Sequence, residues 1–188
     1  MKKYFKMIIV AAIMLLVVVA LCACKSKKSD ASNPMVETDY KGMVEATGID
    51  LPAPDGAKDV EYRYYKNDPK MAEVEFELGD VEYTLRAQTT SLTSAAIAEE
   101  DIAKIDADLL RSKYGDISGI YCEWKLFATV QISNCDGYYA AGGEYSIVNW
   151  LDAAPGIMYS LSTDDDDVSQ QTIMDVATKS FKPVQGEV

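Results

Sequence analysis

The 188-residue chain contains no histidine. This absence excludes the Ser-His-Asp and Cys-His arrangements of hydrolases, because both use an imidazole as general base. It also excludes zinc sites with histidine ligands. A carboxylate pair, a Ser-Lys dyad or a tyrosine acid stays open, but no serine lies in a Gly-x-Ser-x-Gly or Ser-x-x-Lys motif with a supporting context. The sequence therefore predicts no catalytic residue and no cofactor.

Basic residues are few and unevenly placed. The chain has 18 Lys and Arg against 30 Asp and Glu, and its first 28 residues hold six of the basic residues and no acidic one. The rest of the chain therefore carries a formal charge of about −18. A domain this acidic repels phosphate backbones, so nucleic acid is not an expected partner. Solubility explains such acidity, and an acidic docking surface is the alternative.

A hydrophobic run of full membrane-spanning length is also missing, because a span needs about 20 apolar residues and the run over residues 7–21 has fifteen, or eighteen if it is counted through Cys24. This run follows three lysines, which is the layout of a secretory signal peptide. The next residues, Leu21-Cys22-Ala23-Cys24, resemble the lipobox of bacterial lipoproteins. Cys24 fits the cleavage position because the small Ala23 precedes it, whereas bulky Leu21 precedes Cys22.

The expected product is a lipoprotein anchored to the cell membrane on its extracytoplasmic face. Residues 1–23 are the predicted signal peptide, Cys24 is the predicted lipid attachment site, and residues 24–33 form a polar tether. The membrane is then a partner through the N-terminal lipid, and the lysines of the tether favour anionic headgroups. The alternative is an uncleaved anchor helix that runs through Cys24. Both alternatives place the domain outside the cytoplasm.

Residues 34–188 are expected to form a single extracellular domain, because this length supports one core and no linker divides it. Asn33-Pro34 predicts the start of a helix that ends before Gly48. From Val60 the pattern changes to an alternation of apolar and polar residues, which indicates strands with one buried and one solvent-exposed face. The predicted exposed face carries Glu61, Arg63, Glu73, Glu75, Glu77, Glu82 and Arg86.

Two turns set the register of the first strands. Gly79-Asp80 predicts a hairpin with a type II′ turn, because glycine occupies the position that needs positive φ. The earlier turn, at Asn67-Asp68-Pro69, needs an odd number of loop residues, such as 66–70, to keep the apolar side chains on one face. The expected cross-strand pairs of the hairpin are Phe76–Tyr83, Val74–Leu85, Glu73–Arg86 and Glu77–Glu82.

The second half has a similar organisation. Residues 93–113 show helical spacing, and a last helix is predicted over residues 168–182, with Ile173, Val176, Ala177 and Phe181 on its apolar face. The strands predicted between them are 119–125, 128–133, 138–141, 144–150 and 157–162, with Cys135–Gly137 as one separator. The order predicts the α+β class: an antiparallel, meander-rich β-sheet with helices packed on one face.

Short motifs across residues 33–182 resemble a known domain family. They are Asn33-Pro34, Tyr83-Thr-Leu-Arg86-Ala87, Asp116-Ile-Ser-Gly119, and Trp150 followed by Tyr159-Ser-Leu161. Together they resemble an uncharacterised family of clostridial lipoproteins and membrane-anchored extracellular proteins. The resemblance implies a Gram-positive host and a sandwich similar to the PsbP fold. It implies no activity and no site residue, since the family has none assigned, and residues 95–113 are longer than usual for it.

Two groups of residues are candidate sites. The aspartates 164–167 suggest calcium, but they lack the spacing and turn glycine of an EF-hand, and their place before a helix favours capping, so no metal site is predicted. Cys122 and Cys135 remain after removal of Cys22 and acylation of Cys24. Two alternatives are open for them: a disulfide across a hairpin centred near Ala128, or two separate half-buried thiols.

Tyrosine is abundant on the predicted strands, where it is also an ordinary strand former. Tyr65 and Tyr139 are the candidates for a binding surface, because each adjoins a tyrosine that takes the opposite face. We therefore expect a noncatalytic binding or interaction module at the cell surface, with a protein, wall component or small molecule as partner. The alternative is a histidine-free, carboxylate-based hydrolase that acts on cell-wall material.

Overall fold

The computed structural model describes residues 34–182, which belong to one compact unit of the chain, residues 34–188. The predicted signal peptide, Cys24 and the polar tether lie outside the described residues. Within the described part of the chain, no helix is long and apolar enough to cross a membrane.

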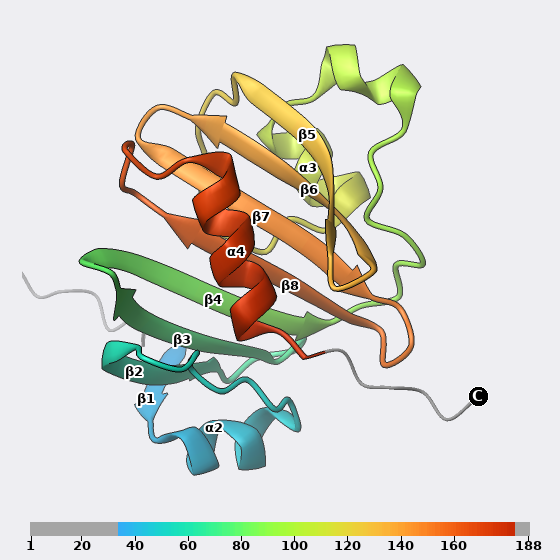
Figure 1. Cartoon of the computed structure of the whole chain (residues 1–188). Helices are drawn as coiled ribbons and strands as arrows, with labels where there is room; N and C mark the ends of the chain where they lie inside the picture. Colours follow the sequence, from blue (N-terminus) through green and yellow to red (C-terminus); the bar gives the residue numbers. More distant parts are fainter. Residues whose placement is uncertain (1–33, 183–188) are drawn as a thin grey trace, which may run out of the picture. The chain divides into compact units, whose positions relative to one another are not determined.

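Eight antiparallel strands form one sheet in the order β1-β2-β3-β4-β8-β7-β6-β5 (Figure 1). Each half of the sheet is a four-stranded meander, and pairing of β4 with β8 joins the two halves. This is the antiparallel, meander-rich sheet of the predicted α+β class. The strands are β1 (Met35–Thr38), β2 (Lys58–Tyr65), β3 (Met71–Leu78), β4 (Val81–Thr89), β5 (Leu126–Ile132), β6 (Cys135–Gly142), β7 (Tyr145–Asp152) and β8 (Ile157–Thr163).

The predicted registers of the first meander are confirmed. All four predicted pairs of the β3–β4 hairpin are present, and Tyr65 pairs with Met71, so the five residues 66–70 connect β2 to β3. The hairpin turn is type I′ and not the predicted type II′, because Gly79 has φ 65° and Asp80 has φ 64°. Aspartate is one of the few residues with a side chain that adopt this left-handed conformation readily.

The first helix begins later than predicted, because a strand precedes it. The helix α2 spans Tyr40–Thr47, and its N-cap is Asp39 and not Asn33: the Asp39 carboxylate accepts a 2.7 Å hydrogen bond from the Gly42 backbone. The preceding residues pair with β2 as strand β1. Gly48 ends the helix in the left-handed conformation, as predicted.

The single helix predicted over residues 93–113 is wrong. This segment contains a 3-10 helix, η1 (Glu99–Lys104), and a short α-helix, α3 (Ala107–Tyr114). Asp106 separates them: its backbone is extended, and its carboxylate accepts a 2.8 Å hydrogen bond from the Leu109 backbone. A strong N-cap inside an amphipathic stretch therefore started a new helix, which the spacing of apolar residues does not reveal.

Two further boundaries differ from the prediction. Residues 119–125 form a loop without strand pairing, and β5 begins only at Leu126. The predicted separator Cys135–Gly137 lies within β6, and the turn is at Ser133-Asn134, where φ is 50° and 71°. Asparagine tolerates this conformation, so the hairpin closes without a turn glycine.

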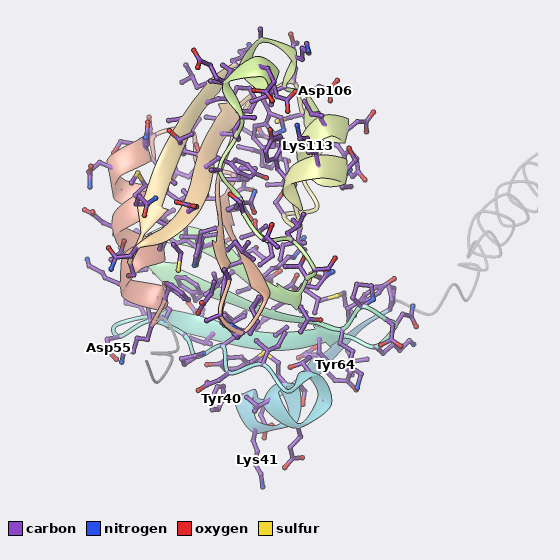
Figure 2. All side chains as sticks on the ribbon, turned by 90° about the vertical axis from the view of Figure 1, so that its right-hand side faces the viewer. Tyr40, Lys41, Asp55, Tyr64, Asp106 and Lys113 are labelled. Atoms are coloured by element: carbon purple, nitrogen blue, oxygen red, sulfur yellow. The ribbon has the colours of Figure 1, made fainter. Side chains whose placement is uncertain are left out.

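Helices cover both faces of the sheet, which corrects the prediction of helices on one face. The last helix, α4 (Gln170–Ser180), and α2 pack with the core of the first face, and the four predicted apolar residues of the last helix are buried there. The helix α3 packs against the second face with Tyr138 and Ile147. Figure 2 shows α3, which carries Lys113 and follows Asp106, across the sheet from α4. Strands β6 and β7 carry apolar side chains on both faces of the sheet, so both faces have to be covered by other elements.

Candidate binding site on the second face

A row of polar side chains crosses the second face of the sheet. Its centre is buried: Glu73 is 2% exposed, and Asn149 and Ser160 are not exposed at all. The prediction that the charged face is exposed to solvent is therefore wrong at Glu73, because Arg63 and Arg86 pair with it and the loop after α3 binds Arg86. The row takes one cross-strand partner from each strand: Glu37, Arg63, Glu73, Arg86, Ser160, Asn149, Tyr138 and Thr129.

Arg86 connects this row to the covering loop. Its Nε donates a 2.7 Å hydrogen bond to Glu73 Oε2, and its Nη1 donates to the backbone oxygens of Ile117, at 3.3 Å, and Ser118. Arg63 reaches the other oxygen of Glu73, with Nη1 at 3.4 Å from Oε1. Both oxygens of the buried carboxylate are thus paired with guanidinium groups, as burial of a charge requires.

Gly119 lets the loop approach Arg86 closely. It has φ 76°, and a Cβ atom at this position would lie 2.4 Å from Arg86 Nη1. A side chain here would displace the guanidinium group or the loop.

Two hollows lie on either side of Arg86. The first has a volume of about 480 Å³ and is rich in carboxylates, with Glu75, Glu77 and Glu82 from β3 and β4 among its lining residues. Several of these carboxylates are ion-paired: Glu75 Oε1 lies 2.5 Å from Arg63 Nη1, and Glu77 Oε1 lies 3.6 Å from Lys58 Nζ. We call this the first hollow.

The second hollow has a volume of about 570 Å³ and lies between the sheet and the end of α3. The sheet contributes a row of cross-strand neighbours to its lining: Tyr65, Met71, Gln88 and Met158. Its other lining residues from α3 and the loop include Arg111, Asp116, Ile117 and Tyr121. The lining thus combines apolar, aromatic and charged groups, which is the composition of small-molecule sites.

The charged groups of the second hollow have unused hydrogen-bonding capacity. Asp116 is 4% exposed, and its Oδ1 accepts from the Ser118 backbone at 2.9 Å and from Asn149 Nδ2 at 3.4 Å. Its Oδ2 is buried without a hydrogen-bond partner, and so is Nη2 of Arg111. The Arg111 guanidinium stacks on the Tyr121 ring, 3.4 Å from its centroid.

Tyr138 and Asn149 support this carboxylate from the sheet. Asn149 Nδ2 donates a 2.8 Å hydrogen bond to the Tyr138 hydroxyl oxygen. Burial raises the pKa of Tyr138 well above 10, and the nearby Asp116 charge raises it further. Tyr138 is therefore a neutral phenol at physiological pH. Among the described residues that line the second hollow, Asp116 is the only one with a carboxylate.

The two tyrosines predicted as binding residues are placed differently. Tyr65 lines the second hollow. Tyr139 is only 5% exposed and packs in the core of the first face, so it offers no binding surface. Its neighbour Tyr138 takes the second face, which is also covered. The alternation of the two tyrosines is as predicted, but the helices on both faces bury each of them.

The structure does not bring the two cysteines together. Both thiols are free and half-buried. Cys122 packs with the second face and contacts the Gly142 oxygen at 3.4 Å, whereas Cys135, at the other end of β6, packs with the first face. Of the two alternatives for these cysteines, the structure has two separate half-buried thiols and not a disulfide.

The aspartates 164–167 precede α4 but do not cap it. The N-cap is Ser169, whose Oγ accepts a 3.1 Å hydrogen bond from the Thr172 backbone, so the predicted capping role is wrong. Asp165 instead closes a turn by accepting from the Asp167 backbone at 2.9 Å. The carboxylates of Asp165, Asp166 and Asp167 lie within 4.8 Å of one another, and two of the three residues are exposed, an arrangement that is common without an ion.

Of the residues that line the second hollow, Tyr65 alone was predicted as a site residue from the sequence, and the charged residues Arg86, Arg111 and Asp116 were not. The family resemblance does point to this part of the fold, because three of its motifs meet here: those that contain Arg86, Ser118 and Ser160. Arg86 donates to the Ser118 oxygen, and Ser160 is the cross-strand partner of Arg86. No family model, no curated protein and no solved structure matches this chain.

Proposed function

We propose that the chain is a lipoprotein whose domain binds a small ligand, without catalysis, on the outer face of a membrane. The N-terminal pattern supports this cellular location: a basic start, a short apolar run and a small residue before Cys24. The resemblance to clostridial lipoproteins supports the same cellular location and a Gram-positive host. A sandwich of sheet and helices similar to the PsbP fold is part of this proposal.

The second hollow is the observation that carries the binding function. Its volume of about 570 Å³ falls within the range of about 300–1,000 Å³ of small-molecule sites. Its lining places one carboxylate and two guanidinium groups among aromatic and thioether side chains. Such a lining can orient a ligand, but it lacks the second carboxylate that a histidine-free hydrolase needs.

The competing hydrolase has weaker support. Its carboxylate pair has to come from the first hollow, where Glu77 and Glu82 are cross-strand neighbours. A general acid there has to be desolvated so that it keeps its proton. The most buried glutamate, Glu73, has both oxygens engaged by arginines, and Glu77 is ion-paired with Lys58, so each of these carboxylates already has a cationic partner.

Mass spectrometry of the protein from its native host tests the proposed cleavage and lipid attachment at Cys24. We expect a mature chain that begins at Cys24 and carries a diacylglycerol group. Cys24→Ser should leave the leader attached, whereas the matched variant Cys22→Ser should be processed normally. An intact leader on the wild-type product, or an unmodified Cys24 thiol at its N-terminus, contradicts the proposal.

Native mass spectrometry of the full chain in mild detergent tests the binding function. We expect a copurified or added small molecule that is released unchanged. The variant Met158→Trp, which fills the second hollow, should lose it, and Glu82→Gln in the first hollow should keep it. Release of soluble fragments from cell-wall material by the wild type, with loss of that release in Glu82→Gln, favours the hydrolase.

A further inference from the structure

Two opposite charges line the second hollow, and each has an unused hydrogen-bonding atom. Arg111 Nη2 is a donor and Asp116 Oδ2 is an acceptor, and both are buried without a partner. Buried polar atoms are normally paired, so these two atoms, on residues that line one cavity, call for a partner such as a water molecule or a ligand.

The two groups do not satisfy each other. Within residues 34–182, neither Arg111 nor Asp116 takes part in an ion pair. The chain has three arginines, and the other two, Arg63 and Arg86, are paired with Glu73. The guanidinium group of Arg111 instead stacks on the ring of Tyr121. In a chain with a large acidic excess, an arginine that lacks a carboxylate partner is well suited to bind a carboxylate from outside.

A ligand with a single charge would fit this pair poorly. An anion would satisfy Arg111 but would approach Asp116 and a strongly acidic domain. A cation would satisfy Asp116 but would be repelled by Arg111 and Arg86. A zwitterion satisfies both atoms and carries no net charge through the acidic field.

We propose that the second hollow binds a free α-amino acid or a dipeptide with an apolar side chain. Its carboxylate pairs with Arg111, and its ammonium group donates to Asp116 Oδ2. The side chain lies toward Met71, Met158 and Tyr65, which form the apolar part of the lining. Thioethers adapt to side chains of different shape, so the hollow accepts several apolar residues. This inference rests on the proposed function and specifies its ligand class.

Titration calorimetry of the full chain in mild detergent tests this with defined probes. L-Leucine and L-methionine are titrated beside N-acetyl-L-leucine, which lacks the ammonium group, and L-leucinamide, which lacks the carboxylate. We expect both blocked probes to bind the wild type at least about tenfold more weakly than L-leucine, because each leaves one buried charge unpaired. Equal affinity for the free and blocked probes, or no binding of any of them, overturns the inference.

Two variants assign the groups. Arg111→Met should bind L-leucine no better than L-leucinamide but should still discriminate against N-acetyl-L-leucine. Asp116→Asn should show the opposite pattern, and Glu82→Gln is the control that leaves both preferences unchanged. Near-ultraviolet circular dichroism checks that each variant keeps its packing. Because the comparison of probes on the wild type needs no variant, a variant that fails to fold does not decide the result.

The outcome separates this inference from the proposed function. Copurification of an unrelated small molecule, with no binding of amino acids, overturns the ligand class and leaves the binding function standing. Conversion of a bound dipeptide into two amino acids would overturn the noncatalytic function, although the ligand class would stand.

Discussion

Glu73 and Arg86 are cross-strand partners whose Oε2 and Nε atoms lie 2.7 Å apart beneath the loop that follows α3. The side chain of Glu73 is 3% exposed and that of Arg86 is 22% exposed. The same guanidinium group also holds the backbone oxygens of the loop. One ion pair therefore connects the sheet to the segment that forms the walls of both hollows.

Removal of one member of this pair should be costly. Arg86→Met leaves the buried Glu73 with only Arg63, and we expect it to lower the free energy of unfolding by about 3 kcal/mol. The double variant Glu73→Met with Arg86→Met should be closer to the wild type, because it leaves no unpaired buried charge. Urea denaturation measures both. If the double variant loses as much stability as the sum of the two single variants, the pair does not act as a unit.

The close approach of the loop at Gly119 gives a second prediction. Gly119→Ala should lower the free energy of unfolding by about 2–4 kcal/mol, because it adds a left-handed backbone penalty to a collision with Arg86. Gly143→Ala is the matched control: its φ is 62°, but nothing lies within 4 Å of the added Cβ. It should cost only the backbone term of about 1–2 kcal/mol. Equal losses in thermal denaturation would show that Arg86 moves aside freely.

The two cysteines should be separate free thiols that react slowly with alkylating reagents. Burial raises the pKa of Cys122, and burial together with Asp152 and Asp136 raises that of Cys135 to about 11. At pH 8 the Cys135 thiolate is therefore scarce, and its alkylation should be about 100-fold slower in the folded protein than in urea. Alkylation followed by mass spectrometry of Cys135 peptides measures this. A change in mass on reduction, which indicates a Cys122–Cys135 disulfide, is the contrary result.

The buried tyrosines predict a loss of stability at alkaline pH. Burial, aided by the Asp152 charge, raises the pKa of Tyr159 to about 12, against about 10 for an unfolded chain. The fold thus favours the neutral phenol: this contribution is complete below pH 10 and is lost as the pH rises toward 12. Urea denaturation between these pH values should show it, with a smaller loss in Tyr159→Phe. An identical pH dependence in wild type and variant excludes Tyr159 as the source.

Much of the fold followed from local pattern. The alternation of Val74, Phe76 and Leu78 with glutamates placed the β3–β4 hairpin and its register correctly, because strand side chains alternate and a tight turn leaves one pairing. Errors arose where one side chain changed the local structure. Asp106 divided a predicted helix, and Asn134 closed a hairpin without a turn glycine.

The candidate site could not be predicted in the same way. Glu73 follows the period of an exposed glutamate, and only the loop that folds back over Arg86 makes it a buried ion pair. Arg111 and Asp116 lie far from Met71 and Met158 in the sequence. The packing of α3 on the second face brings all four residues to one cavity. Contacts over such separations in the chain leave no local periodicity.

By itself, the sequence determined the acidity, the absence of histidine and the register of the β3–β4 hairpin, and it is the basis of the proposed lipid attachment at Cys24. These depend on composition or on neighbours along the chain. The tertiary structure alone decided which charged residues are buried, which tyrosines are hidden and where a hollow forms. Burial depends on which segment covers a face, and that is set by packing between residues far apart in the chain.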